Sequence, residues 1–82
     1  MRNRSMADDK IHGVIALVAE VLEIEQDELG PDSSMDTVPS WDSVEHMNIC
    51  LAFEQRFGTR LDGEAISTAV SIRSLAALVP QP

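Results

Sequence analysis

The sequence predicts an all-α fold, a small bundle of three main helices and one short helix. Three segments place apolar residues at the spacing of one helix face, the principal signal of amphipathic helices. β-Branched residues do not alternate with polar ones, and tyrosine, which is favoured in strands, is absent. The 82 residues suffice for one domain but not for two.

The first helix is expected from Asp8 to Leu22. Asp8 and Asp9 place negative charge near its N-terminal end, where the helix dipole favours it. The apolar stripe of this helix follows the spacing i, i+3, i+4, i+7 and consists of Ile11, Val14, Ile15, Val18, Val21 and Leu22.

A long loop is expected next, from Glu23 to Ser40. Gly30, Pro31 and Pro39 interrupt helix formation along it, and several turn-forming residues lie between them. A loop of this length in so small a domain is often functional. Four apolar residues are expected to pin the loop to the core: Ile24, Leu29, Met35 and Val38.

The second main helix is expected to begin at Asp42 or Ser43 and to end at Phe57. Gly58 follows it and is a natural residue to adopt the left-handed conformation after a helix. The apolar positions of this helix predict two faces. One face is expected in the core and consists of Ile49, Cys50, Phe53 and Phe57, whereas the other lies near Ser43 and consists of Val44, Met47 and Leu51.

Two further helices complete the predicted bundle. A short one covers Gly63 to Ser67, and a last one runs from its N-cap Ser71 to Val79, where Pro80 stops it. The chain therefore divides into a disordered lead-in, a folded domain and a tail, over residues 1–7, 8–79 and 80–82.

The charge balance is strongly acidic. Fourteen acidic residues face six basic ones, and the formal net charge is −8. Such a surface repels phosphate backbones, which makes nucleic acid an unfavourable partner, and attracts basic patches on other proteins. Plain solubility is the alternative interpretation of the acidity. We also expect a monomer. The longest weakly charged run is too short and too charged to span a bilayer, so no membrane association is expected.

The cysteine content points to a reducing compartment. The single cysteine, Cys50, excludes a disulfide within the chain, and a secreted domain of this size usually needs such cross-links. A cytoplasmic location is therefore expected.

The stretch "SWDSVEHM" contains the principal candidate site. Asp42 and Glu45 are spaced as in a capping box, which would make Ser43 the first helical residue, with its hydroxyl exposed at the positive helix end. A phosphate ester on that oxygen would be well placed. Alternatively, Ser43 itself caps the helix.

Catalytic and metal-binding interpretations of the same region are weaker. His46 follows Ser43 by one turn, but the chain has no G-x-S-x-G elbow, and a domain this small hardly builds a catalytic cleft. A Cys50–His46 pair is conceivable, although Cys50 falls on the apolar arc and is expected in the core. The acidic loop resembles the start of a calcium-binding loop but carries Thr37 where that loop requires glycine, and Ser43 where it requires glutamate.

The stretch "WDSVEHMNICLAFEQRFG" resembles the acyl carrier protein family. The family pattern is D-S-L at the start of a helix, followed by apolar positions and E-x-x-F, which Glu54 and Phe57 match here. The chain from about Lys10 to Val79 fits the family's helix order and loop lengths. The final "SIRSLAALV" is similar to the T-V-x-D-L-x-x-x-I helix of the family.

The resemblance implies a function. In the family, the serine that Ser43 matches carries a 4′-phosphopantetheine arm, which a phosphopantetheinyl transferase transfers from coenzyme A. Asp42 matches the acid before that serine. The arm's thiol holds acyl or aminoacyl groups as thioesters for partner enzymes, so the chain is expected to be a discrete carrier rather than an enzyme. The expected partner-binding residues surround the second helix and are Val44, Glu45, Met47, Leu51 and Glu54.

Two departures from the family pattern narrow this expectation. Val44 replaces the usual leucine, and Pro39-Ser40-Trp41 stands where fatty-acid carriers have a short Gly-containing stretch. They favour a dedicated pathway, such as polyketide or specialised lipid synthesis, over housekeeping fatty acid synthesis. Trp41 is also expected to dock the loop onto the bundle. The alternative function is a carrier-like interaction module that never receives the arm.

Overall fold

The computed structural model describes residues 6–80. Within them the chain forms two long helices, two short helices and one 3-10 turn, and no strand beyond an isolated bridge between Ser34 and Ser71. The all-α prediction is confirmed, with two main helices instead of three. The elements are α1 (Met6–Leu22), η1 (Gln26–Glu28), α2 (Ser43–Phe57), α3 (Gly63–Thr68) and α4 (Ile72–Ala76).

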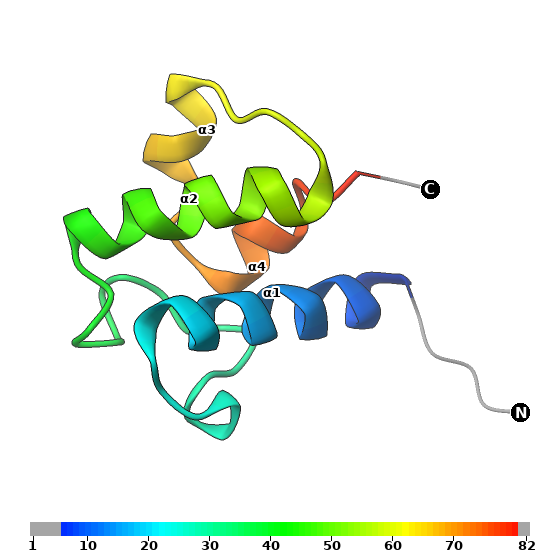
Figure 1. Cartoon of the computed structure of the whole chain (residues 1–82). Coiled ribbons are helices and arrows are strands. Elements are labelled where there is room, and N and C mark those ends of the chain that lie inside the picture. The colour runs from blue at the N-terminus through cyan, green and yellow to red at the C-terminus, as the bar shows by residue number, and fades with distance from the viewer. Residues whose placement is uncertain (1–5, 81–82) are drawn as a thin grey trace, which may run out of the picture.

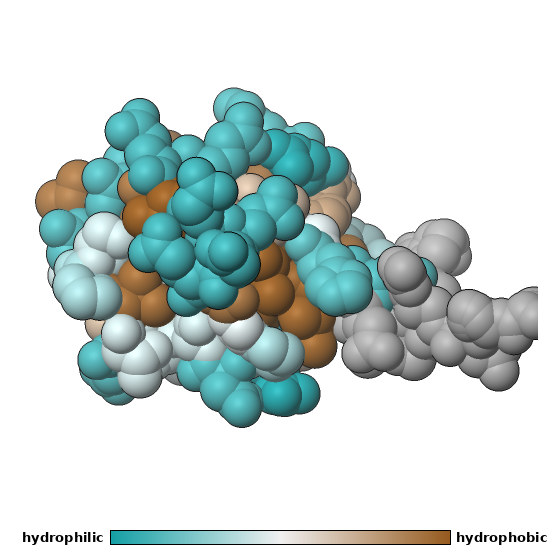
Figure 2. All heavy atoms as spheres, turned by 90° about the horizontal axis from the view of Figure 1, so that it is seen from below, coloured by the Kyte–Doolittle hydropathy of each residue, from teal (hydrophilic) through white to brown (hydrophobic). Residues whose placement is uncertain are grey.

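Helices α1 and α2 run antiparallel to each other, and α4 packs against α1 (Figure 1). Their apolar faces meet in one core, in which the fully buried side chains are Val14, Leu17, Val18, Trp41, Ile49, Cys50, Phe53, Ile72 and Leu75. Polar side chains cover much of the lower face of the molecule, with apolar atoms visible between them (Figure 2). No helix within residues 6–80 has the length and apolar character needed to cross a membrane.

Helix α1 begins at Met6 and not at the expected Asp8. Methionine and alanine are strong helix formers, and no helix breaker precedes Asp8 in this stretch, so the helix extends further toward the N-terminus. Helix α1 thus extends over Met6 and Ala7, the last two residues of the expected lead-in over residues 1–7. Residues 1–5 of the expected lead-in and residues 81–82 of the expected tail lie outside the described residues.

The ends of α1 and α2 share one hydrogen-bond pattern. After α1, the Ile24 N–H donates to the Ala19 carbonyl at 3.0 Å, and after α2 the Thr59 N–H donates to the Glu54 carbonyl at 3.2 Å. Such six-to-one bonds mark the Schellman motif, whose turning residue adopts a left-handed conformation. The turning residue of α2 is Gly58, as predicted, with φ 64°. In α1 it is Glu23, with φ 60°.

Because a glycine turns the chain after α2 and a glutamate turns it after α1, substitutions at these two positions should change the free energy of unfolding in opposite directions. Glu23→Gly is expected to raise the free energy of unfolding by up to about 1 kcal/mol, because glycine adopts the left-handed conformation without a Cβ clash. Gly58→Ala is the matched control and is expected to lower the free energy of unfolding by about 1 kcal/mol. Denaturant melts of both variants provide the measurement. Two shifts of the same sign would contradict the shared motif.

The loop between α1 and α2 is pinned as predicted. Leu29 and Val38 are buried, and Ile24 and Met35 pack against the core while half-buried. The turn η1 within this loop was not predicted. Backbone hydrogen bonds also join the loop to the start of α4 and to the residue before its cap. The Ile72 N–H donates to the Ser33 carbonyl at 2.9 Å, and the Met35 N–H donates to the Val70 carbonyl at 3.0 Å.

The last helix is shorter than expected. Ser71 is its N-cap, as predicted, but the α-helix ends at Ala76 rather than Val79. The Leu78 and Val79 N–H groups donate to carbonyls three residues back, which tightens the final turn. Pro80 is the physical reason, because a proline disfavours the α conformation in the residue before it. The short helix α3 extends one residue past the expected Ser67, to Thr68.

Candidate functional site

Asp42 is the N-cap of α2. Its backbone is extended, and its Oδ1 accepts a hydrogen bond from the Glu45 N–H at 2.9 Å. The predicted capping role is confirmed for Asp42, and the alternative that Ser43 caps the helix is wrong. The reciprocal half of the expected capping box does not form, and the Glu45 carboxylate accepts from Asn48 Nδ2 at 3.4 Å.

Ser43 is the first residue of α2 and is exposed. Among the described residues, no protein acceptor pairs with the N–H of Ser43 or of Val44, as expected for the first turn of a helix. These donors and the helix dipole favour an anion close to the Ser43 hydroxyl. Since Asp42 already secures the helix end, this hydroxyl is free to carry a phosphodiester, and the surroundings fit one.

His46 points into the protein. Its side chain is only 5% exposed, its Nδ1 is 3.1 Å from Nε1 of Trp41, and its Nε2 is 2.8 Å from the Ile66 carbonyl oxygen. Both ring nitrogens are therefore engaged inside the bundle, and the structure does not bring His46 to the Ser43 hydroxyl. The catalytic serine–histidine interpretation is wrong for this reason. Trp41 is 1% exposed and docks the loop, as predicted.

Cys50 lies in the core, as predicted. Its Sγ is 3.6 Å from His46 Nε2. Burial raises the pKa of the Cys50 thiol, and the negative charge of Glu54 raises this pKa further. Because the thiolate is the nucleophile, a buried thiol of raised pKa is unreactive at neutral pH. The Cys50–His46 pair is thus a packing contact.

The two predicted faces of α2 differ in burial. Ile49, Cys50 and Phe53 are buried, and Phe57 packs on Phe53 with 4.8 Å between ring centroids. The second face is exposed, with Val44 at 70%, Met47 at 48% and Leu51 at 56%. Three exposed apolar side chains on one helix of a small acidic protein form a patch beside the first turn of α2. We call these three residues the α2 patch.

Glu54 has a structural contact that the sequence did not indicate. Its Oε2 accepts a hydrogen bond from the Leu61 N–H at 2.7 Å, which holds the connection between α2 and α3 against the end of α2. The bond forms because Gly58 reverses the chain direction and brings Leu61 back toward Glu54. Glu45, by contrast, remains near Ser43 at the start of the helix.

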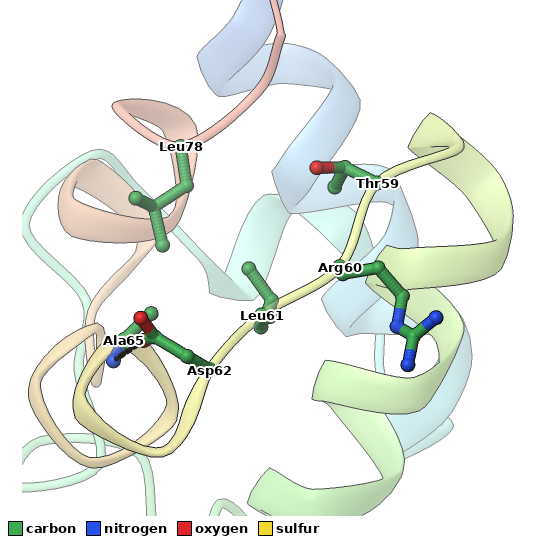
Figure 3. Close-up of a pocket in the computed structure, with 6 residues that line it drawn as sticks. All are labelled: Thr59, Arg60, Leu61, Asp62, Ala65 and Leu78. Atoms are coloured by element: carbon green, nitrogen blue, oxygen red, sulfur yellow. Dashed lines mark hydrogen bonds between the residues drawn. The ribbon is translucent and has the colours of Figure 1, made fainter.

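A hollow of about 580 Å³ lies beyond this connection (Figure 3). Leu61, Ala65 and Leu78 converge on it, whereas the guanidinium of Arg60 points away. None of the site residues predicted from the sequence lines it. Among residues 6–80, no group of three or more histidine, cysteine or acidic side chains is arranged to hold a metal ion.

A helical bundle that exposes a separately capped serine at the start of its second long helix has the architecture of a carrier domain. A family model described as a phosphopantetheine attachment site matches residues 12–79, which is most of the chain. The chain belongs to this family, and the predicted resemblance to acyl carrier proteins is confirmed. No curated protein matches the chain significantly.

Membership of this family establishes which cofactor the protein takes and its general role as a carrier. Domains of this family are sites of covalent 4′-phosphopantetheine attachment, as predicted. They are carriers without catalytic activity of their own, and they work with phosphopantetheinyl transferases and biosynthetic enzymes. The residues around Ser43 fit such a group, because they offer an exposed hydroxyl, free backbone donors and a positive helix end.

Proposed function

We propose that this protein carries acyl or aminoacyl groups on a 4′-phosphopantetheine arm attached to Ser43. The observation that supports this proposal most directly is the exposed Ser43 hydroxyl on a helix whose end Asp42 caps independently. When attached, the arm supplies a thiol that holds the acyl group as a thioester for partner enzymes. The protein itself positions the arm and presents the surface that partners bind.

The attachment step balances with coenzyme A as the donor. The Ser43 oxygen forms a bond to the phosphorus that bears pantetheine, and the phosphoanhydride bond of coenzyme A breaks. Adenosine bisphosphate leaves, and the hydroxyl proton passes to a base on the transferase. The N–H groups of Ser43 and Val44, which have no acceptor within residues 6–80, lie at the helix end where this phosphate would sit.

The α2 patch and the surrounding acidity support a partner-binding role for this face. Val44, Met47 and Leu51 are exposed in the free protein, although apolar side chains of this size are usually buried. Asp42 and Glu45 place negative charge beside them. We propose that these five residues, together with the outward part of Glu54, meet basic partner surfaces.

The pathway is part of the same proposal. The valine at position 44 and the Pro39-Ser40-Trp41 segment support a dedicated route, such as polyketide or specialised lipid synthesis, over housekeeping fatty acid synthesis. We further propose that the carrier acts as a monomer in the cytoplasm, away from membranes and nucleic acid. The net charge of −8 and the single buried cysteine support this.

The deciding experiment is intact-mass spectrometry after incubation with a broad-specificity phosphopantetheinyl transferase and coenzyme A. The expected result is a complete mass gain of one phosphopantetheine. Omitting the transferase is the control and should leave the mass unchanged. A protein that stays unmodified under conditions that load a known carrier would favour the alternative, an interaction module that never receives the arm.

Loading is expected to weaken with salt. Charge attraction between the acidic face and a basic transferase is screened over about 8 Å at physiological ionic strength, so the transferase KM should rise as salt is added. Glu45→Lys should raise KM at low salt and flatten this dependence. Asp27→Lys makes the same charge change on η1 and is the matched control. Equal effects of both reversals, or a KM independent of salt, would leave the acidity as a solubility feature.

A further inference from the structure

His46 is a buried titratable side chain that the proposed function does not use. It lies one turn after Ser43 on α2, and its ring is enclosed between the Trp41 indole and α3. The two rings are stacked, with 6.0 Å between centroids and 29° between planes. The imidazole therefore joins the loop before α2, the helix α2 and the helix α3.

The hydrogen bonds of His46 define its protonation. An indole N–H can only donate, so Nδ1 of His46 must accept from Trp41 at 3.1 Å and carry no proton. The remaining nitrogen, Nε2, then carries the proton and donates to the Ile66 carbonyl at 2.8 Å. The neutral imidazole thus satisfies both partners with its one donor and its one acceptor.

Helix α3 is joined to α2 by this contact. None of its residues is buried, and its own hydrogen bonds are local, such as that from the Ala65 N–H to the Asp62 cap at 2.8 Å. Within residues 6–80, no other hydrogen bond joins α3 to a neighbouring helix. A short helix with little buried surface has low local stability, so its backbone signals should respond to a change at the His46 ring.

We propose that His46 is a proton-operated latch, which holds the Trp41 indole on α2 when neutral and releases it when protonated. A proton added to Nδ1 turns that atom into a donor that faces the indole donor, while Nε2 keeps its bond to the Ile66 carbonyl. The buried positive charge then has no acceptor at Nδ1, and separation of the indole from the ring admits water to that atom. The released surface adjoins the turn that carries Ser43, but the latch itself does not require the arm.

Other titratable groups near the ring must be distinguished from it. Asp42 and Glu45 lie at the start of α2, and Glu64 lies on α3. The Cys50 thiol has a raised pKa and stays protonated below neutral pH. The pH titration therefore runs from about pH 8 to about pH 5, the range in which histidines in general change charge, and a His46 variant identifies the contribution of this ring.

The chain offers a direct reporter of the latch. Trp41 is the only tryptophan, and there is no tyrosine, so intrinsic fluorescence reports on the indole that bonds to His46. We expect a red shift of the emission between about pH 8 and about pH 5, because release exposes the indole to water. The backbone amide NMR signals of α3, Ile66 among them, and of its C-cap Ala69 should shift with the same midpoint as the Trp41 indole signal.

Three variants of the full-length apo protein complete the test. His46→Gln cannot gain the proton and should remove the transition, whereas the exposed His12→Gln should leave it unchanged. Trp41→Phe keeps the packing ring but removes the opposing donor, so the midpoint of the α3 signals should rise by about 0.5–1 pH unit, the equivalent of one hydrogen bond. If His46→Gln does not fold, the change of the midpoint in Trp41→Phe is by itself the test of the latch. A transition that persists in His46→Gln, or an unchanged or lower midpoint in Trp41→Phe, would overturn the latch.

Discussion

Replacement of Ser43 by alanine is expected to abolish attachment of the phosphopantetheine arm while the fold stays intact. The substitution removes the only oxygen that the proposal assigns to the phosphodiester. The free energy of unfolding should change by less than about 0.5 kcal/mol, because the side chain is exposed and Asp42 supplies the N-cap bond to the Glu45 N–H. Intact mass after transferase treatment and a denaturant melt measure the two effects on the same sample.

Two controls distinguish the site from the helix end. Ser40→Ala removes another exposed hydroxyl close by and should load normally. Asp42→Ala removes the cap and should lower the free energy of unfolding by about 1 kcal/mol, while its serine can still be modified. Full loading of Ser43→Ala would place the attachment site elsewhere. Unfolding of Ser43→Ala would instead show that this residue, and not Asp42, secures the helix.

Phe53→Ala is expected to lower the free energy of unfolding by roughly 3–5 kcal/mol. Phe53 is fully buried in the second half of α2, and its ring packs against Phe57. Small domains are stable by only about 5–15 kcal/mol, so this loss is a large share of the total. A urea melt measures it, and the slope of the transition shows whether the variant still unfolds in one step.

The exposed face of α2 should behave differently. Met47→Ala, in the α2 patch, is expected to cost about 1 kcal/mol or less, because the side chain is 48% exposed. We expect it to impair loading or acyl transfer all the same, since the patch is the proposed contact with partners. Leu51→Ala tests a second position of the patch. Equal destabilisation by Phe53→Ala and Met47→Ala, with normal loading of the latter, would show that the patch belongs to the core.

The proposed latch connects the loop before α2 to the surface around Ser43. His46 accepts a hydrogen bond from Trp41 in the same turn of α2 that follows the attachment serine. A partner enzyme that contacts this loop and the α2 patch together would therefore meet two different surfaces, depending on the charge of one imidazole. Attachment of the arm and release of Trp41 are separate events, and each can be tested without the other.

The sequence by itself determined the features that depend on neighbouring residues. The caps at Asp42 and Ser71 and the left-handed turn at Gly58 all lie where the sequence places them. Each results from contacts within a few residues, which a local pattern records. The two faces of α2 were also predictable, because helical spacing decides which side chains share a face. The acyl carrier resemblance and Ser43 as the candidate site followed from the same local signals.

Only the tertiary structure decided the contacts between residues far apart in the chain. His46 suggested a catalytic partner from its spacing to Ser43, yet its ring turns inward because Trp41 and the Ile66 carbonyl, twenty residues away, offer it complementary hydrogen bonds. The bond from Leu61 to Glu54 likewise depends on a reversal of the chain that brings the two together. Such pairings depend on how the elements pack, and no spacing in the sequence encodes which buried donor will meet which acceptor.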